Sequence, residues 1–175
     1  PLPTSSTPAK IGLVIKSSLY IIESIPKYNK KEKSILDMVK KKLRVAIIGL
    51  GYLGKYHLEK FLKNRNVAVK WVIDSDINNL KLNINESIRK STNFKDIIGD
   101  VDCASIVTPT TSHFQIAKSL LQNKINILLE KPMTQSLSQA KKLNTMVKGK
   151  KIIMQVGHLE RFNPVMKNLT SVVKN

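Results

Sequence analysis

The sequence predicts an α/β fold, a doubly wound parallel sheet with helices on both faces. From residue 43 onward, short apolar segments alternate with segments of helical periodicity. The apolar segments carry few polar side chains, as expected of parallel strands that are covered on both faces. A glycine-rich turn, GLGYLG at residues 49–54, directly follows the first apolar segment and opens a helical one. Together these observations favour a Rossmann-type sheet.

Each element follows from a local pattern of apolar residues. The predicted strands are 43–48, 67–73, 103–107, 125–129 and 152–156. The predicted helices are 53–63, about 77–90, 113–123 and 136–147, with a last one beginning near Pro164. Ser112 followed by Gln115 has the spacing of a capping box, so the third of these helices is expected to begin at residue 113.

The chain of 175 residues is long enough for one core of about 130 to 150 residues. Residues 1–42 contain a Pro- and Ser-rich lead and a charged linker, and we expect them to be poorly ordered or foreign to the functional fold. Residues 43–160 are then the dinucleotide-binding domain, and 161–175 the beginning of a crossing into a second domain. No apolar run reaches about 18 residues, so no membrane span is expected.

The single cysteine, Cys103, excludes an internal disulfide and a cysteine-rich zinc site, which suits a reducing, cytoplasmic location. Its apolar neighbours favour a buried strand residue over a reactive thiol. The formal charge of +18 brings nucleic acid into consideration as a partner. However, only four of the 30 basic residues are Arg, and the lysines are spread along the whole chain. A general composition bias therefore fits better than a nucleic-acid-binding patch.

The glycine turn has the spacing G-x-G-x-x-G, with glycines at positions 49, 51 and 54. In this pattern Gly49 allows the tight turn, Gly51 lets the backbone approach a pyrophosphate, and Gly54 lets helix and strand pack closely. Tyr52 and Leu53 then place their backbone N–H groups at the positive end of the helix, where phosphates bind. The turn predicts a dinucleotide site.

An acid at the end of the second strand supports the same site. Asp74 lies 20 residues after Gly54, where a carboxylate accepts hydrogen bonds from the adenosine ribose. Its negative charge would repel a 2′-phosphate, so NAD is favoured over NADP. A structural alternative, an acid that caps the following turn, fits Asp76 better than Asp74.

Further motifs resemble the N-terminal half of the glucose-fructose oxidoreductase, inositol dehydrogenase and MocA (Gfo/Idh/MocA) family, over about residues 43–167. The resemblance depends on the glycine turn, the strand-end acid and two further patterns that occur in the family's order. The first pattern is T-P followed by a histidine, at Thr108, Pro109 and His113. The second is E-K-P, at Glu130, Lys131 and Pro132. A further histidine, His57, follows the glycine turn.

The resemblance implies roles for these positions. Thr108 and Pro109 would line the dinucleotide, Glu130 would contact it, and Lys131 would be the catalytic lysine beside the nicotinamide and substrate. An ammonium there can hydrogen-bond a developing alkoxide or assist proton transfer while hydride moves to the cofactor. The alternative is that Lys131 has no catalytic role and is a solvated surface residue like the other lysines.

The two histidines allow more than one interpretation. His113 could contact the cofactor or only pack and cap its helix. For His57 a structural role is favoured. Neither has the second histidine and carboxylate at the spacing of a zinc site, so no metal is expected.

The segment QVGHLERFNP, residues 155–164, resembles the family's crossing into its second domain. Its residues are similar to those of family members that act on nucleotide sugars. There Arg161 could hold a substrate oxygen or pair with an acid. The resemblance implies a sugar or nucleotide-sugar substrate, a second α+β domain that is missing here, and a homo-oligomer at full length. We therefore expect the cofactor-binding half of an NAD(P)-dependent oxidoreductase, with little turnover by itself. The alternatives are a dinucleotide-sensing module and a basic nucleic-acid-binding protein.

Overall fold

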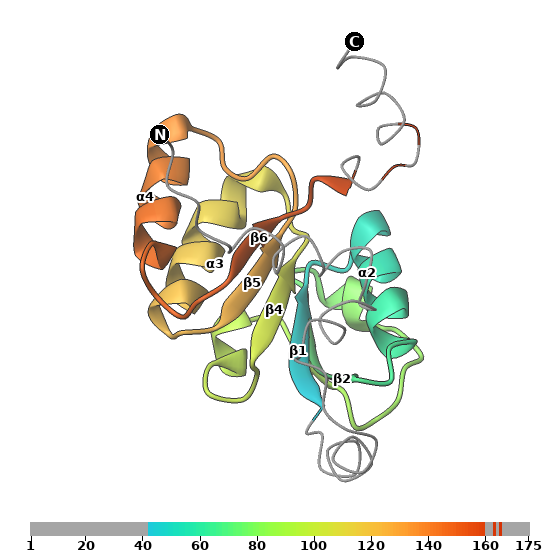
Figure 1. Cartoon of the computed structure of the whole chain (residues 1–175). Coiled ribbons are helices and arrows are strands. Elements are labelled where there is room, and N and C mark those ends of the chain that lie inside the picture. Colours follow the sequence, from blue (N-terminus) through green and yellow to red (C-terminus); the bar gives the residue numbers. More distant parts are fainter. Residues whose placement is uncertain (1–41, 160–162, 164, 166–175) are drawn as a thin grey trace, which may run out of the picture.

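The computed structural model describes residues 42–159, 163 and 165, and it contains one parallel sheet of six strands (Figure 1). The strand order is β3-β2-β1-β4-β5-β6, that of a Rossmann fold. The strands are β1 Leu43–Ile48, β2 Val67–Ile73, β3 Arg89–Ser91, β4 Cys103–Ile106, β5 Asn126–Leu129 and β6 Met154–Val156. The helices are α2 Tyr52–Leu62, α3 Thr110–Gln122 and α4 Leu137–Val147, with 3-10 turns η2 Ile77–Leu80 and η3 Phe94–Ile97. The predicted fold class is confirmed.

Helices cover both faces of the sheet, with α2 on one face and α3 and α4 on the other (Figure 1). Successive residues of β1 alternate between the two cores. Val45 and Ile47 pack in the cluster that includes Leu58 and Phe61 of α2. Ala46 and Ile48 point the opposite way, toward α3 and α4. A strand buried on both faces is apolar throughout, which explains the run that precedes the glycine turn.

The order of the strands fixes where a ligand can bind. The chain leaves β1 toward β2 and β3 on one side, and then crosses back to β4 on the other side of β1. The connections after β1 and β4 therefore diverge at the carboxyl ends of two adjacent strands. In open α/β sheets this point of divergence leaves a crevice, where ligands bind.

The helix predicted over about 77–90 is wrong. The structure has only the short turn η2 there, followed by extended chain and by β3, which pairs with β2 at the sheet edge. Leu82 and Ile84 pack partly against the same core as Leu80, in an alternating pattern. Four asparagines in the segment favour turns over helix. Pairing with the free edge of β2 outweighs the weak helical periodicity.

The helix predicted from residue 113 begins earlier, at Thr110, with Pro109 at the N-cap. The capping-box interpretation of Ser112 is therefore wrong: its hydroxyl lies 2.7 Å from Thr108 Oγ1 and 2.8 Å from the Pro109 carbonyl, inside the first turn. At α4 the hydroxyl of Ser136 does cap the helix, accepting a hydrogen bond from the backbone N–H of Gln139 at 3.3 Å.

Several predictions lie outside the described residues. These are the nature of the lead before residue 42, the last helix near Pro164, the crossing segment 161–175 and Arg161. Within the described part of the chain, none of the helices has the length and apolar character needed to cross a membrane.

Candidate functional site

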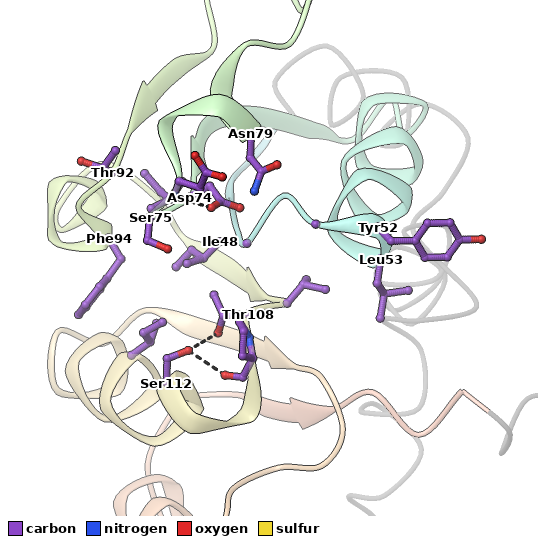
Figure 2. Close-up of a pocket in the computed structure, with 17 residues that line it drawn as sticks. Ile48, Tyr52, Leu53, Asp74, Ser75, Asn79, Thr92, Phe94, Thr108 and Ser112 are labelled. Atoms are coloured by element: carbon purple, nitrogen blue, oxygen red, sulfur yellow. Dashed lines mark hydrogen bonds between the residues drawn. The ribbon is translucent and has the colours of Figure 1, made fainter.

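A cleft of about 520 Å³ opens at the carboxyl ends of β1, β2 and β4 (Figure 2). The glycine turn, the residues after β2 and the turn after β4 form its walls. Seven of the predicted site residues line it: Gly49, Gly51, Tyr52, Leu53, Asp74, Thr108 and Pro109. The four others in the described chain, Gly54, His113, Glu130 and Lys131, do not line this cleft.

The three glycines of the turn meet different surroundings. Gly49 has φ +91°, and a Cβ there would lie 2.7 Å from the carbonyl carbon of Val107. A Cβ on Gly54 would lie 1.9 Å from the Gly49 carbonyl oxygen. A Cβ on Gly51 would meet no atom within 4 Å. Gly49 and Gly54 therefore keep the turn compact, whereas Gly51 leaves open space that faces the cleft.

The N-terminus of α2 points its backbone N–H groups at this open space. Gly51 is the N-cap, and none of the side chains that the structure describes caps the helix. The first N–H groups of a helix have no partner within it, and the helix dipole makes this end positive. Figure 2 shows the Tyr52 ring pointing away from the cleft, and it is 80% exposed. Tyr52 thus contributes backbone rather than side chain, and the site fits a diphosphate.

Asp74 holds the glycine turn and also faces the cleft (Figure 2). Its Oδ2 accepts a hydrogen bond from the Leu50 N–H at 2.6 Å, and its Oδ1 accepts one from the Asp76 N–H at 2.9 Å. Each carboxylate oxygen has a second acceptor site that these bonds leave available. Asp76 is the residue that caps η2, accepting from the Asn78 N–H at 2.9 Å.

His113 joins the turns that follow β4 and β5. It is only 1% exposed, with Nδ1 2.9 Å from the Pro132 carbonyl oxygen and Nε2 2.8 Å from the Thr108 carbonyl oxygen. Of the two roles considered for His113, this position supports packing, because the ring lies between the two turns and does not line the cleft. The cofactor contact remains a prediction.

Glu130 and Lys131, at the end of β5, have opposite surroundings. Lys131 is exposed, whereas Glu130 is 4% exposed. Glu130 Oε2 accepts a hydrogen bond from the Lys131 N–H at 3.1 Å, and Oε1 lies 3.4 Å from His57 Nε2. That second distance is long for a hydrogen bond.

Burial opposes ionisation of Glu130, but His57, the Lys131 N–H and the nearby charges outweigh it and hold the pKa of this carboxyl below its usual value of 4.5. Since the folded-state pKa is the lower one, the ionised carboxylate stabilises the fold at neutral pH. This contribution is lost as the pH falls through the folded-state pKa.

The variant Glu130→Gln is therefore expected to flatten the pH dependence of stability. Its free energy of unfolding should fall less than that of the wild type between about pH 5 and pH 3. Urea denaturation at each pH measures this. Glu59→Gln is the control, because the pKa of Glu59 is also lowered, by Lys63, but the pair is on the surface, where such pairs contribute little. Parallel curves for wild type and Glu130→Gln would contradict the role of the carboxylate.

Sequence reasoning missed part of the cleft. Thr92 and Phe94, which follow β3, line it, as do Asn79 of η2 and Ile116 of α3. The predicted helix over 77–90 concealed Thr92 and Phe94, because it left no strand to carry residues 92–94 to the cleft. Ser105 beside His57 was missed too, since nothing in a strand sequence indicates which buried serine meets a distant helix. Among residues 42–159, 163 and 165, no three His, Cys, Asp or Glu side chains form a cluster that could hold a metal ion.

The fold and the cleft together define a dinucleotide-binding domain of the Rossmann class. Residues 43–158 match the model of a family described as an oxidoreductase family with an NAD-binding Rossmann fold. The chain belongs to this family, Gfo/Idh/MocA, and its cofactor is NAD. The resemblance noted in the sequence is thereby confirmed.

Individual relatives cover the same part of the chain. UDP-N-acetylglucosamine 3-dehydrogenase of Acidithiobacillus ferrooxidans is 29% identical over 128 residues, which are 73% of this chain and 40% of that protein. The NAD-dependent scyllo-inositol 2-dehydrogenase of Bacillus subtilis is 29% identical over 127 residues, covering 70% of this chain and 37% of that protein. A crystal structure of myo-inositol 2-dehydrogenase from Lactobacillus plantarum superimposes with a TM-score of 0.70 at 28% identity. The match covers 77% of this chain and 42% of that one. The chain thus spans about two fifths of the length of these relatives.

Proposed function

We propose that this chain is the cofactor-binding half of an oxidoreductase that transfers hydride between NAD and a hydroxyl or ketone group of a sugar or nucleotide sugar. The observation that carries the proposal is the open space at Gly51, where the first N–H groups of α2 face a cleft that Asp74 also lines. Family membership and the names of the relatives support the redox class and the kind of substrate.

Each wall of the cleft has a proposed task. The N–H groups of Gly51, Tyr52 and Leu53 bind the diphosphate. Asp74, held in place by Leu50, accepts hydrogen bonds from the ribose hydroxyls with its remaining acceptor sites. A 2′-phosphate would bring negative charge against this buried carboxylate, so we propose that NADP binds less well. Thr108 and Pro109 form the opposite wall.

Lys131 is the proposed catalytic residue. When NAD is bound, its nicotinamide accepts the hydride from the substrate carbon. The Lys131 ammonium can hydrogen-bond the substrate oxygen as negative charge develops there, or take part in moving its proton. This assignment is supported by its exposed position after β5, at the same edge of the sheet as the cleft. Glu130 remains a proposed cofactor contact and Arg161 a proposed substrate contact.

The kind of substrate is proposed from the relatives alone. One acts on UDP-N-acetylglucosamine and the other on an inositol, both small molecules rich in hydroxyl groups. We propose that a second α+β domain completes the substrate site and that the full-length protein forms a homo-oligomer.

Titration of the chain with NADH and NADPH tests the function. The wild type is expected to bind NADH more tightly than NADPH. Asp74→Ala should weaken NADH binding about tenfold or more, the value of one charged hydrogen bond, and should weaken NADPH binding less. Nicotinamide fluorescence measures both affinities.

The ratio of the two affinities separates two effects of this variant. Losing the anchor on Leu50 alone would weaken both cofactors equally, whereas losing the ribose contact changes the ratio. Glu86→Ala is the matched control, because Glu86 is an exposed acid that does not line the cleft, and it should leave the ratio unchanged. An unchanged ratio in Asp74→Ala would remove the ribose role, and absence of NADH binding in the wild type would overturn the proposed function.

A further inference from the structure

Three polar side chains from three elements lie in contact beneath Lys131 and form a largely buried group. His57 of α2 has its Nδ1 2.8 Å from Ser105 Oγ of β4, and its Nε2 3.4 Å from Glu130 Oε1 after β5. The side chains of His57 and Glu130 are 13% and 5% exposed, and Ser105 is 1% exposed. None of the three lines the cleft. Their position calls for a role other than direct contact with a dinucleotide in that cleft.

Within the group of His57, Ser105 and Glu130, hydrogen-bond donors and acceptors match in either charge state of the histidine. A neutral imidazole has one N–H, and an ionised carboxylate only accepts. Nε2–H can therefore face Glu130 while Nδ1 accepts a hydrogen bond from the Ser105 hydroxyl. If the ring takes up a second proton, Nδ1–H can donate to the Ser105 oxygen instead, because a hydroxyl serves as donor and acceptor. His57 can thus change its charge without leaving a ring nitrogen unpaired.

The carboxylate of Glu130 is restrained from the other sides. Its Oε2 accepts the Lys131 N–H at 3.1 Å. On the Oε1 side the backbone of Gly157 approaches so closely that a Cβ there would lie 2.5 Å from that oxygen. Among the described residues Oε1 has no hydrogen-bond partner, although it is buried. The nearby Nε2 of His57 is therefore the polar group that holds this oxygen in place.

We propose that His57 is a positioning residue for Lys131. It holds the Glu130 carboxylate against the Lys131 N–H, and so fixes the backbone from which the lysine side chain extends. Among the described residues, the ionisable groups near the imidazole are Glu130 and Lys131 after β5, with Tyr56 and Lys60 within one turn on α2. β4 brings the uncharged Ser105, and the segment after β6 brings the uncharged Gly157, with the exposed His158 next to it in the sequence. That Lys131 is catalytic depends on the function proposed above, whereas the coupling itself does not.

The backbone amide of Lys131 reports this coupling directly, because its proton is bonded to the Glu130 carboxylate. We would record ¹H–¹⁵N spectra of the chain over a range of about pH 5 to 8.5 and follow the ring signals of His57 in the same samples. The Lys131 amide is expected to shift in step with the titration of the His57 ring. His57→Gln and Glu130→Gln should each abolish that movement, and Ser105→Ala should displace its midpoint. His158→Gln, at an exposed histidine, should leave it unchanged.

A Lys131 amide that does not move with pH in the wild type would overturn the inference, and so would one that moves equally in His57→Gln. The wild-type measurement decides even if a variant fails to fold. NADH binding is measured separately in the same samples. Coupling without NADH binding would refute the proposed function and leave the positioning role intact, and NADH binding without coupling would do the reverse.

Discussion

Alanine at position 51 is expected to remove most NADH binding and leave the fold intact. The backbone of Gly51 has φ −61°, which any residue adopts, and a Cβ there would meet no protein atom within 4 Å. The methyl group would instead occupy the space through which a diphosphate reaches the N–H groups of α2. We expect at least a hundredfold loss of affinity, about 2.7 kcal/mol, measured by NADH fluorescence.

The free energy of unfolding of Gly51→Ala should stay within about 0.5 kcal/mol of the wild type, as for a surface substitution. Lys55→Ala, at an exposed position of the same helix, is the control for both measurements and should bind NADH normally. Full NADH affinity in Gly51→Ala would show that the diphosphate does not lie on this turn, and the proposed binding mode would fail.

Alanine at position 54 is expected to have the opposite effect, a large loss of stability. Its Cβ would lie 1.9 Å from the carbonyl oxygen and 2.8 Å from the carbonyl carbon of Gly49. Both are backbone atoms of the turn, so no side chain can rotate away, and α2 or the turn must shift. Overpacking typically costs 1 to 3 kcal/mol, and a clash with backbone should cost about 3 kcal/mol or more.

That loss is large beside a total domain stability of about 5 to 15 kcal/mol. Urea denaturation of Gly54→Ala and Gly51→Ala side by side makes the comparison, since both add one methyl group to the same turn. Equal stability of the two variants would contradict the close packing of α2 against the turn after β1.

Much of the fold could be predicted because the signals are local. The strands at 43–48 and 67–73 have the predicted bounds, since continuous apolar runs can be stable only when both faces are covered. The glycine spacing indicated the site, because the backbone conformation of such a turn needs glycine at fixed positions. Asp74 could be predicted as well, since a strand end has a fixed place relative to the turn beside it.

Pairing between elements could not be predicted in the same way. Residues 77–90 have a weak helical pattern, but their end forms β3 because the edge of β2 offers hydrogen bonds to it. Within β2, the register shifts so that Val69 pairs with Val45 but Trp71 with Ala46, and Lys70 is the extra residue. As a result Val69 and Trp71 pack on opposite faces, although alternation alone would place them on the same one.

The sequence by itself determined the class of fold, the dinucleotide turn and the acid that faces it, because each depends on the conformation of a few consecutive residues. Only the tertiary structure decided that Ser105, His57 and Glu130 meet beneath Lys131. These contacts join residues 48 or more positions apart. Their formation depends on how the sheet and its helices pack, which no local pattern of residues specifies.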